Sequence, residues 1–284
     1  MGVSIKRVLY FPVTKIIIGY AVCFLLLVVI QNFVSKPILY NIIKDKSIAN
    51  PIIHCISVIV LLASYFYLFR LYEKRKITEL SIKHLPKEMF GGFILGFLTI
   101  SLSIFILYLL RYYQAISITT THYSIKLFTL LIIAALIEDL FNRGLIVREL
   151  ENWLGTNIAI IIGMLIETQH IFNPNANLFS LFFDLIWGFT LAMMFIYTKR
   201  IWLSFFFHLG WNFAQPFYGS NLTGLDDMGS IIQSKFNGPE LLTGGAVGIE
   251  NSIFTVSLLL FIGITLYYLA KKEGKIVKSK LFKR

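Results

Sequence analysis

Ionisable and amide side chains lie inside apolar stretches of this chain, where lipid makes polar groups costly. They fall in three segments: Glu138, Asp139 and Arg143 in residues 126–147, Glu167 and His170 in residues 157–173, and His208 and Asn212 in residues 201–217. Ionisable groups inside membrane spans usually mark a functional site, because they persist only where the protein shelters them. Three such segments in one chain predict a buried polar chamber.

Acid–base hydrolysis is the chemistry that these residue types fit. A carboxyl group shielded from water holds protons more readily, so Glu138 can serve as a base toward a water molecule. His170 can orient that water or share its proton, and His208 and Asn212 can donate hydrogen bonds to the oxyanion of an attacked carbonyl. Glu138, His170 and His208 also make a ligand set that suits zinc. The sequence leaves the metal-free and the zinc-dependent interpretation open.

Helical spacing divides these residues between faces. Asp139 and Arg143 are spaced to form an ion pair along one face of a helix. Glu138 is turned by about 100° from Asp139, so its carboxylate points in another direction. His208 and Asn212 have the same spacing as the ion pair and share a face. Each segment alone also fits a structural role, because such groups brace membrane helices against one another.

The composition predicts which elements hold these groups. Hydrophobic residues make up 57% of the 284 residues and 14% are charged, whereas a soluble domain carries about 25% charged residues. The mean hydropathy is +0.74. Apolar runs long enough to cross a bilayer recur along the chain. We therefore predict an all-α polytopic membrane bundle of about eight helices, at residues 14–33, 51–70, 90–111, 126–147, 157–173, 178–197, 201–217 and 252–270.

The charge distribution orients this bundle. Most of the 26 Lys and Arg residues fall on one side if both termini are placed in the cytoplasm, which agrees with the positive-inside rule. The net charge of +11 is explained by these span ends and by contact with anionic lipid, so nucleic-acid binding is not expected. The chain is read as an integral membrane protein, and its Ile- and Lys-rich composition suggests a bacterial cell membrane.

We expect one membrane domain over residues 1–284, with soluble segments between its spans. Residues 70–89 are basic and predict a cytoplasmic surface helix interrupted by Pro86. Residues 219–251 are rich in Gly and predict an outer connector without regular structure, with a cover over the site as the alternative. Residues 271–284 predict a basic cytoplasmic tail.

Three motifs resemble those of the CPBP family of intramembrane proteases, also called Abi or CAAX-protease-like. The family has Glu-Glu-x-x-x-Arg, Phe-x-x-x-His and His-x-x-x-Asn, in that order. This chain has corresponding stretches at Glu138 to Arg143, Ile166 to His170, and His208 to Asn212. The resemblance covers residues 125–216 and implies an eight-helix membrane bundle. It implies that Glu138 and His170 activate water while His208 and Asn212 bind the oxyanion, and the family's need for a metal is disputed.

The chain departs from the family pattern at two positions. Asp139 replaces the second Glu of the first motif, which keeps the charge but shortens the side chain. Ile166 replaces the Phe of the second motif. Glu167 adds an acid that can partner Arg143 or influence His170. Asp139, Arg143 and Glu167 are therefore assigned supporting roles.

The motifs and their setting favour an intramembrane endopeptidase that cuts a peptide or a membrane-associated protein. The resemblance implies prenyl-protein processing in eukaryotes; for a bacterium, we expect signalling peptides, bacteriocin leaders or membrane proteins as substrates. A non-catalytic scaffold of the same fold, acting in bacteriocin immunity or membrane regulation, is the alternative. A transporter is disfavoured because no internal repeat is visible. The sequence does not indicate an oligomeric state.

Overall fold

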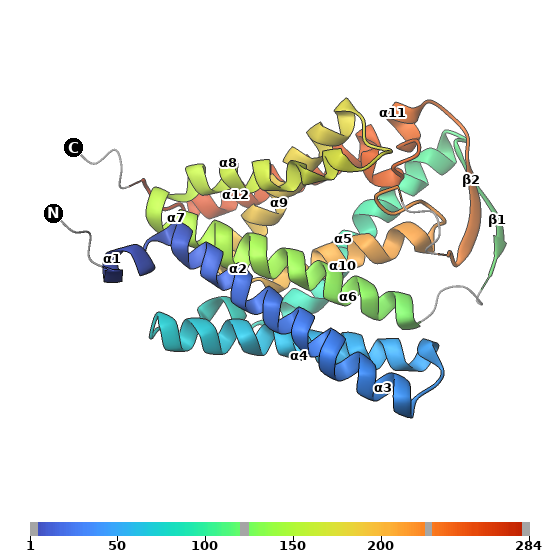
Figure 1. Ribbon diagram of the computed structural model, residues 1–284. Coiled ribbons are helices and arrows are strands. Elements are labelled where there is room, and N and C mark those ends of the chain that lie inside the picture. The colour runs from blue at the N-terminus through green and yellow to red at the C-terminus, as the bar shows by residue number, and fades with distance from the viewer. Residues whose placement is uncertain (1–4, 120–124, 225–228, 280–284) are drawn as a thin grey trace.

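The computed structural model describes residues 5–119, 125–224 and 229–279, with the side chains of residues 170 and 171 outside that description. Its long elements are helices, which confirms the predicted all-α polytopic bundle (Figure 1). Five helical segments in the described residues are long and apolar enough to cross a membrane. They are residues Pro12–Ile42, Lys46–Tyr72, Leu85–Leu109, Leu178–Thr198 and Ile253–Lys272.

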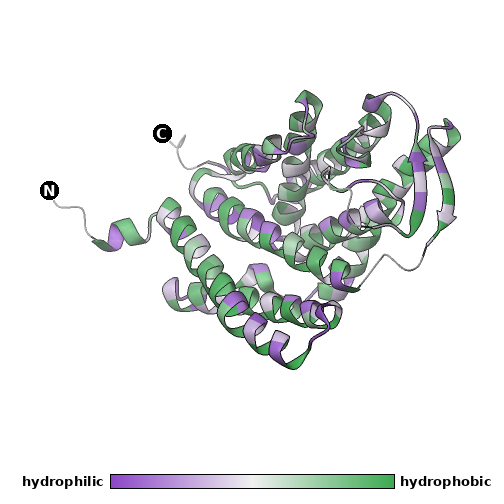
Figure 2. Ribbon diagram, turned by 45° about the vertical axis from the view of Figure 1, so that its right-hand side comes forward, coloured by the Kyte–Doolittle hydropathy of each residue, from purple (hydrophilic) through white to green (hydrophobic). Residues whose placement is uncertain are grey.

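These five segments contain most of the long helices of the bundle. The first is divided into α2 (Pro12–Val29), the π-helix η1 (Ile30–Ser35) and α3 (Lys36–Ile42), and it follows the short α1 (Ile5–Leu9). The others are α4 (Lys46–Tyr72), α5 (Leu85–Leu109), α9 (Leu178–Thr198) and α12 (Ile253–Lys272). Apolar residues run along the whole length of these helices in Figure 2, as lipid contact requires.

The three remaining predicted spans, which carry the motifs, fold as shorter pieces. The segment predicted at residues 126–147 is α6 (Ile125–Glu138) followed by the π-helix η3 (Asp139–Val147), and α7 (Arg148–Leu154) continues it. The next is α8 (Thr156–Glu167), which leads into the 3-10 helix η4 (Thr168–Phe172). The last is α10 (Trp202–Phe217). Helices this short depend on neighbouring helices to cover their polar groups.

Close packing fixes α10, which carries His208 and Asn212, against α5. A methyl group on Gly96 of α5 would overlap the backbone of Phe207, and one on Gly210 of α10 would overlap the backbone of Phe93. Small residues at such crossings let two membrane helices approach closely and gain van der Waals contact. The backbone on either side of His208 is therefore held rigidly.

The two ends of the bundle differ in structure. The N- and C-terminal parts of the chain lie together at one end (Figure 1). The opposite end carries an antiparallel ribbon of β1 (Tyr113–Ile118) and β2 (Ile232–Phe236), with Tyr113 opposite Phe236. Both strands contain hydrophilic as well as hydrophobic residues (Figure 2). We call these the terminus end and the ribbon end.

The segment after α10 is more regular than its sequence indicates. Its described part holds β2, the short helix α11 (Glu240–Thr243) and the 3-10 helix η5 (Ile249–Asn251). The prediction of a connector without regular structure is therefore wrong for the described residues. Contacts that the composition does not show order it: Ser220 Oγ accepts a hydrogen bond from the Ile249 backbone at 2.8 Å, and Asn221 donates to Ala246.

Two further soluble segments at the terminus end also pack onto the bundle. Residues 73–84 form a loop with the 3-10 helix η2 (Thr78–Leu80), so the predicted surface helix is wrong; Pro86 starts α5 instead, where its missing N–H is no loss. The described part of the basic tail exchanges two hydrogen bonds, of 3.0 and 2.8 Å, between Val277 and Thr156. This tail segment therefore lies against the start of α8.

Candidate active site

A π-helical stretch carries the first motif. Residues Asp139–Val147 form η3, directly after Glu138 at the end of α6. π-Helical turns are rare and occur frequently at functional sites, because they redirect side chains that a regular α-helix would align. Asp139 and Arg143 are almost completely buried here, whereas the side chain of Glu138 is 33% exposed. The segment therefore buries its ion-pairing groups and turns Glu138 toward open space.

The closest partner of Asp139 is His208 on α10. Oδ2 of Asp139 lies 2.9 Å from Nδ1 of His208, and both side chains are buried. A carboxylate only accepts hydrogen bonds, so this contact assigns a hydrogen to Nδ1. The ion pair predicted between Asp139 and Arg143 is present but longer, at 3.7 Å. The carboxylate of Asp139 thus orients the imidazole rather than serving only as a brace.

The other face of His208 meets Glu138 and an aromatic wall. Nε2 of His208 lies 3.9 Å from Oε2 of Glu138. Trp187 of α9 contacts the imidazole edge-on, with ring centroids 5.0 Å apart and planes at 83°. The ring is therefore fixed by a hydrogen bond on one nitrogen and by packing on its face. At a separation of 3.9 Å, Oε2 of Glu138 and Nε2 of His208 are close enough for one water molecule to contact both.

A second buried ion pair anchors η3 to α8. Nη2 of Arg143 lies 2.9 Å from Oε1 of Glu167, and both side chains are 1% exposed. Asn142 donates a hydrogen bond of 2.8 Å to the same oxygen. The partnership of Glu167 with Arg143, one of two alternatives left by the sequence, is thus the one observed. Buried charges of this kind must be paired, because an uncompensated one is strongly destabilising.

A cavity of about 280 Å³ lies beside Glu138 and His208. Glu138, His208 and Asn212 all line it, with Asn212 placed one turn after His208 on α10. Its walls come from α6, α9, α10 and the segment after α10, which contributes Leu222, Thr223, Val247 and Glu250. That segment therefore closes part of the cavity, which was the alternative interpretation of residues 219–251.

The structure places Glu138, His208 and Asn212 at one cavity, and their catalytic roles stay predictions. His170 is the predicted catalytic residue whose side chain the structure does not describe. It belongs to η4, which begins directly after α8, but its side chain lies outside the described residues. A zinc site needs at least three protein ligands. Among the described side chains, no group of three His, Cys, Asp or Glu residues is arranged to hold a metal. The described residues alone thus do not fit a zinc site.

Two acids of the cavity received little weight from the sequence. Asp184 on α9 lines the cavity and is 1% exposed. Glu250 was missed. It accepts a hydrogen bond of 2.8 Å from Gln215 and lies 3.5 Å from Nε1 of Trp211. The sequence signal for Glu250 was its position as an acid shortly before the apolar run of α12.

The fold and site together define a helical membrane protein with a carboxylate-oriented histidine beside a second carboxylate. Residues 120–214 match the family described as "Type II CAAX prenyl endopeptidase Rce1-like". This segment contains all three motifs, and the match confirms the family recognised from them. At the level of the family, the matched segment is similar to CAAX-protease-type intramembrane endopeptidases. No curated protein and no solved structure matches the chain.

Proposed function

We propose that this chain hydrolyses a peptide bond of a membrane-associated substrate with water activated by Glu138. The cavity of about 280 Å³ receives the scissile bond. The observation that carries the proposal is the sequence of contacts from Asp139 through His208 to Glu138, with separations of 2.9 and 3.9 Å. A buried carboxylate that orients an imidazole beside a second carboxylate is a recurring arrangement in acid–base catalysis.

In the first step, the carboxylate of Glu138 accepts a proton from a water molecule bound between it and His208. The oxygen of that water adds to the scissile carbonyl carbon, and the carbonyl oxygen becomes an oxyanion. Asn212 donates to this oxyanion through its side-chain amide, and His208 donates through Nε2 when the ring is protonated. Asp139 stabilises that charged ring.

In the second step, the tetrahedral intermediate collapses and the carbon–nitrogen bond breaks. Protonated Glu138 returns its proton to the leaving nitrogen, so the carboxylate is regenerated and the products are a carboxylic acid and an amine. His170, whose role is proposed from the motif alone, shares the proton of the water. No metal ion is needed for the balance of these two steps.

The position of the cavity supports access from the ribbon end. The segment after α10 contributes to its lining, and β2 of this segment pairs with β1 at that end (Figure 1). With both termini proposed in the cytoplasm of a bacterial cell, the site would open toward the outer face of the membrane. Exported peptides, such as bacteriocin leaders or signalling peptides, are then the proposed substrates.

Cleavage of an internally quenched peptide library by the purified protein in lipid nanodiscs tests this function. We expect Glu138→Gln, which keeps the shape but cannot accept the proton, to lower the rate by at least about two orders of magnitude. Glu240→Gln is the matched control, because Glu240 is exposed on α11. Both variants must unfold at the wild-type temperature.

The same experiment addresses the non-catalytic scaffold. Equal cleavage by Glu138→Gln and wild type would contradict the assignment of the base. No cleavage by any of the three proteins, together with a cellular phenotype that Glu138→Gln preserves, would favour a scaffold that binds a membrane partner.

A further inference from the structure

The π-helix η3 has an unusual backbone pattern at Gly144. In an α-helix, the N–H of Arg148 would donate to the carbonyl of Gly144. Here that N–H donates to Arg143 and Leu145 instead. The displacement follows from the wider π turn, in which each N–H reaches back one residue further. The carbonyl of Gly144 thereby loses the partner that a regular helix would give it.

Two side chains reach this carbonyl in place of the helical bond. Nε of Arg148 donates to it at 2.9 Å, and the hydroxyl of Tyr65 lies 2.6 Å from it. The same hydroxyl lies 2.7 Å from Oε1 of Glu79, so its hydrogen is shared between two acceptors. Tyr65 is completely buried on α4. In an α-helix the carbonyl of Gly144 would already accept a hydrogen bond from the N–H of Arg148. The two side-chain contacts therefore stabilise the π-helical hydrogen-bond pattern and not an α-helical one.

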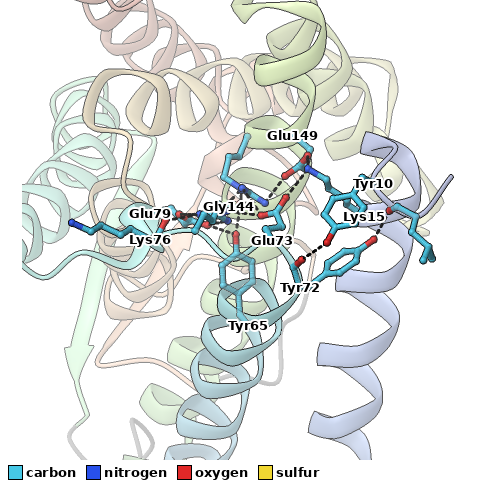
Figure 3. A network of polar contacts seen from close by, with 12 residues as sticks. Tyr10, Lys15, Tyr65, Tyr72, Glu73, Lys76, Glu79, Gly144 and Glu149 are labelled. Carbon is cyan, nitrogen blue, oxygen red and sulfur yellow. Dashed lines mark hydrogen bonds and ion pairs between the residues drawn. The ribbon is translucent and has the colours of Figure 1, made fainter. Parts of the chain in front are cut away.

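Tyr65 and Arg148 are themselves held by a network of charges at the terminus end (Figure 3). Glu79, which is 1% exposed, contacts Nη2 of Arg75 at 2.5 Å and Nε of Arg148 at 3.5 Å. Glu73 contacts Arg75 and Arg148 at 2.5 and 3.4 Å. The network thus joins the loop after α4 to α7.

The first transmembrane helix joins the same network. Lys15 of α2 contacts Glu73 at 2.6 Å and Glu149 at 3.2 Å, and Glu149 contacts Nη2 of Arg148 at 2.6 Å. Three cations therefore face three carboxylates, with the carboxylates at most 7% exposed and the cations 10–25% exposed. Removal of a cation leaves a largely buried carboxylate without its counter-charge, which is destabilising.

The register of η3 decides where the carboxylates of Glu138 and Asp139 point. A π turn holds one residue more than an α turn, and one residue turns a helix by about 100°. If η3 reverted to α-helical bonding, Glu138 and Asp139 would rotate by that angle relative to α7. Asp139 would then leave His208, and Glu138 would leave the cavity. Whatever maintains the π register also maintains the site.

We propose that Tyr65 and Arg148 are positioning residues, which hold η3 in its π register through Gly144 and so keep Glu138 and Asp139 against His208. The network at the terminus end thereby controls the geometry of a site in the interior of the bundle. Only the kinetic consequence of this proposal rests on the proposed function. The conformational consequence concerns the backbone of η3 and is independent of it.

Hydrogen–deuterium exchange of the full-length protein in nanodiscs tests the conformational part. Tyr65→Phe removes the hydroxyl and keeps the ring. We expect exchange of the amides in residues 139–147 to accelerate roughly 3- to 10-fold, the scale for loss of one hydrogen bond. Tyr72→Phe is the matched control, since the Tyr72 hydroxyl at the same end donates to Leu9 and not to η3 (Figure 3). Equal exchange in both variants would overturn the proposal.

Arg148→Lys provides a second variant that keeps the charge but removes the Nε donor. We expect Arg148→Lys to accelerate amide exchange in η3 as Tyr65→Phe does. If Tyr65→Phe does not fold, Arg148→Lys still tests whether contacts to the Gly144 carbonyl hold the π register. In the cleavage assay both variants should lower kcat by about tenfold, with KM within about twofold of wild type, because the contacts act on geometry and not on substrate. Tyr72→Phe should leave both constants unchanged.

These readouts separate the two proposals. Exchange that accelerates in a protein without cleavage activity would support the positioning of η3 and contradict the protease. Normal exchange with normal kcat in Arg148→Lys and Tyr65→Phe would contradict the positioning role and leave the protease intact.

Discussion

Arg143 and Glu167 form an ion pair of 2.9 Å that ties η3 to the end of α8, with each side chain 1% exposed. Arg143→Ala should therefore reduce folded yield and thermal stability as well as activity. Loss of one member of a buried pair costs on the order of 3–5 kcal/mol, because the remaining carboxylate is left without its counter-charge. Thermal unfolding in detergent measures this. A wild-type unfolding temperature with activity alone lost would instead place Arg143 in the chemistry.

Asp139→Asn should impair catalysis severely, because Asp139 contacts His208 at 2.9 Å. An amide cannot stabilise a protonated ring and favours the wrong tautomer, and a comparable change in a catalytic triad costs on the order of 10⁴-fold in kcat. We expect a loss of at least about 10²-fold here with KM little changed. The sequence alone indicated a milder effect, since it paired Asp139 with Arg143. Cleavage kinetics with unfolding controls decide between the two expectations.

Gly96→Ala should displace α10 at His208. The added methyl group would overlap the backbone of Phe207, and overpacking of this kind typically costs about 1–3 kcal/mol. Gly91→Ala on the same helix is the control, since nothing lies within 4 Å of the added group. We expect a lower unfolding temperature and lower activity for Gly96→Ala only. Matching behaviour of the two variants would mean that the α5–α10 contact is looser than described.

Acid should weaken the network at the terminus end. Burial alone would raise the pKa of Glu73, but the charge of Arg148 and hydrogen bonds from Arg75 and Lys15 outweigh it and lower the pKa from 4.5 to about 2. The unfolded chain therefore binds more protons in this interval, so the stabilisation is complete above pH 4.5 and is lost as the pH falls toward 2.

The pH dependence of thermal unfolding in detergent checks this expectation. The unfolding temperature of the wild-type protein should fall more steeply below pH 4.5 than that of Glu73→Gln. Glu240→Gln serves as the control, since Glu240 is exposed. Parallel slopes for wild type and Glu73→Gln would show that the ion pairs of Glu73 add nothing to stability.

The sequence predicted the helical bundle because an apolar run of this length typically forms a helix that crosses the bilayer. A helical segment lies at each predicted span, although the first extends to Ile42 rather than residue 33. Two of these spans bring Glu138, His208 and Asn212 to one cavity. The ribbon of β1 and β2 was not predicted. Its strands are short and pair across more than a hundred residues, a separation that local patterning does not report.

The details of the site depended on features that periodicity does not show. The i, i+4 spacing of Asp139 and Arg143 predicts their directions only for a regular α-helix, whereas η3 is a π-helix from Asp139 onward. In the π-helical geometry, the carboxylate of Asp139 contacts His208. Glu250 lines the cavity from a segment without a hydrophobic pattern, so periodicity did not indicate its place there.

A double-mutant cycle between Glu138 and His208 tests the central claim most directly. The account holds that the two residues act on the same water and oxyanion as one unit, so their losses should not multiply. We predict that Glu138→Gln and His208→Gln each lower kcat by at least about 10²-fold, and that the double variant is no worse than the slower single variant. Losses that multiply in the double variant, or a Glu138→Gln protein with wild-type kcat, would contradict it.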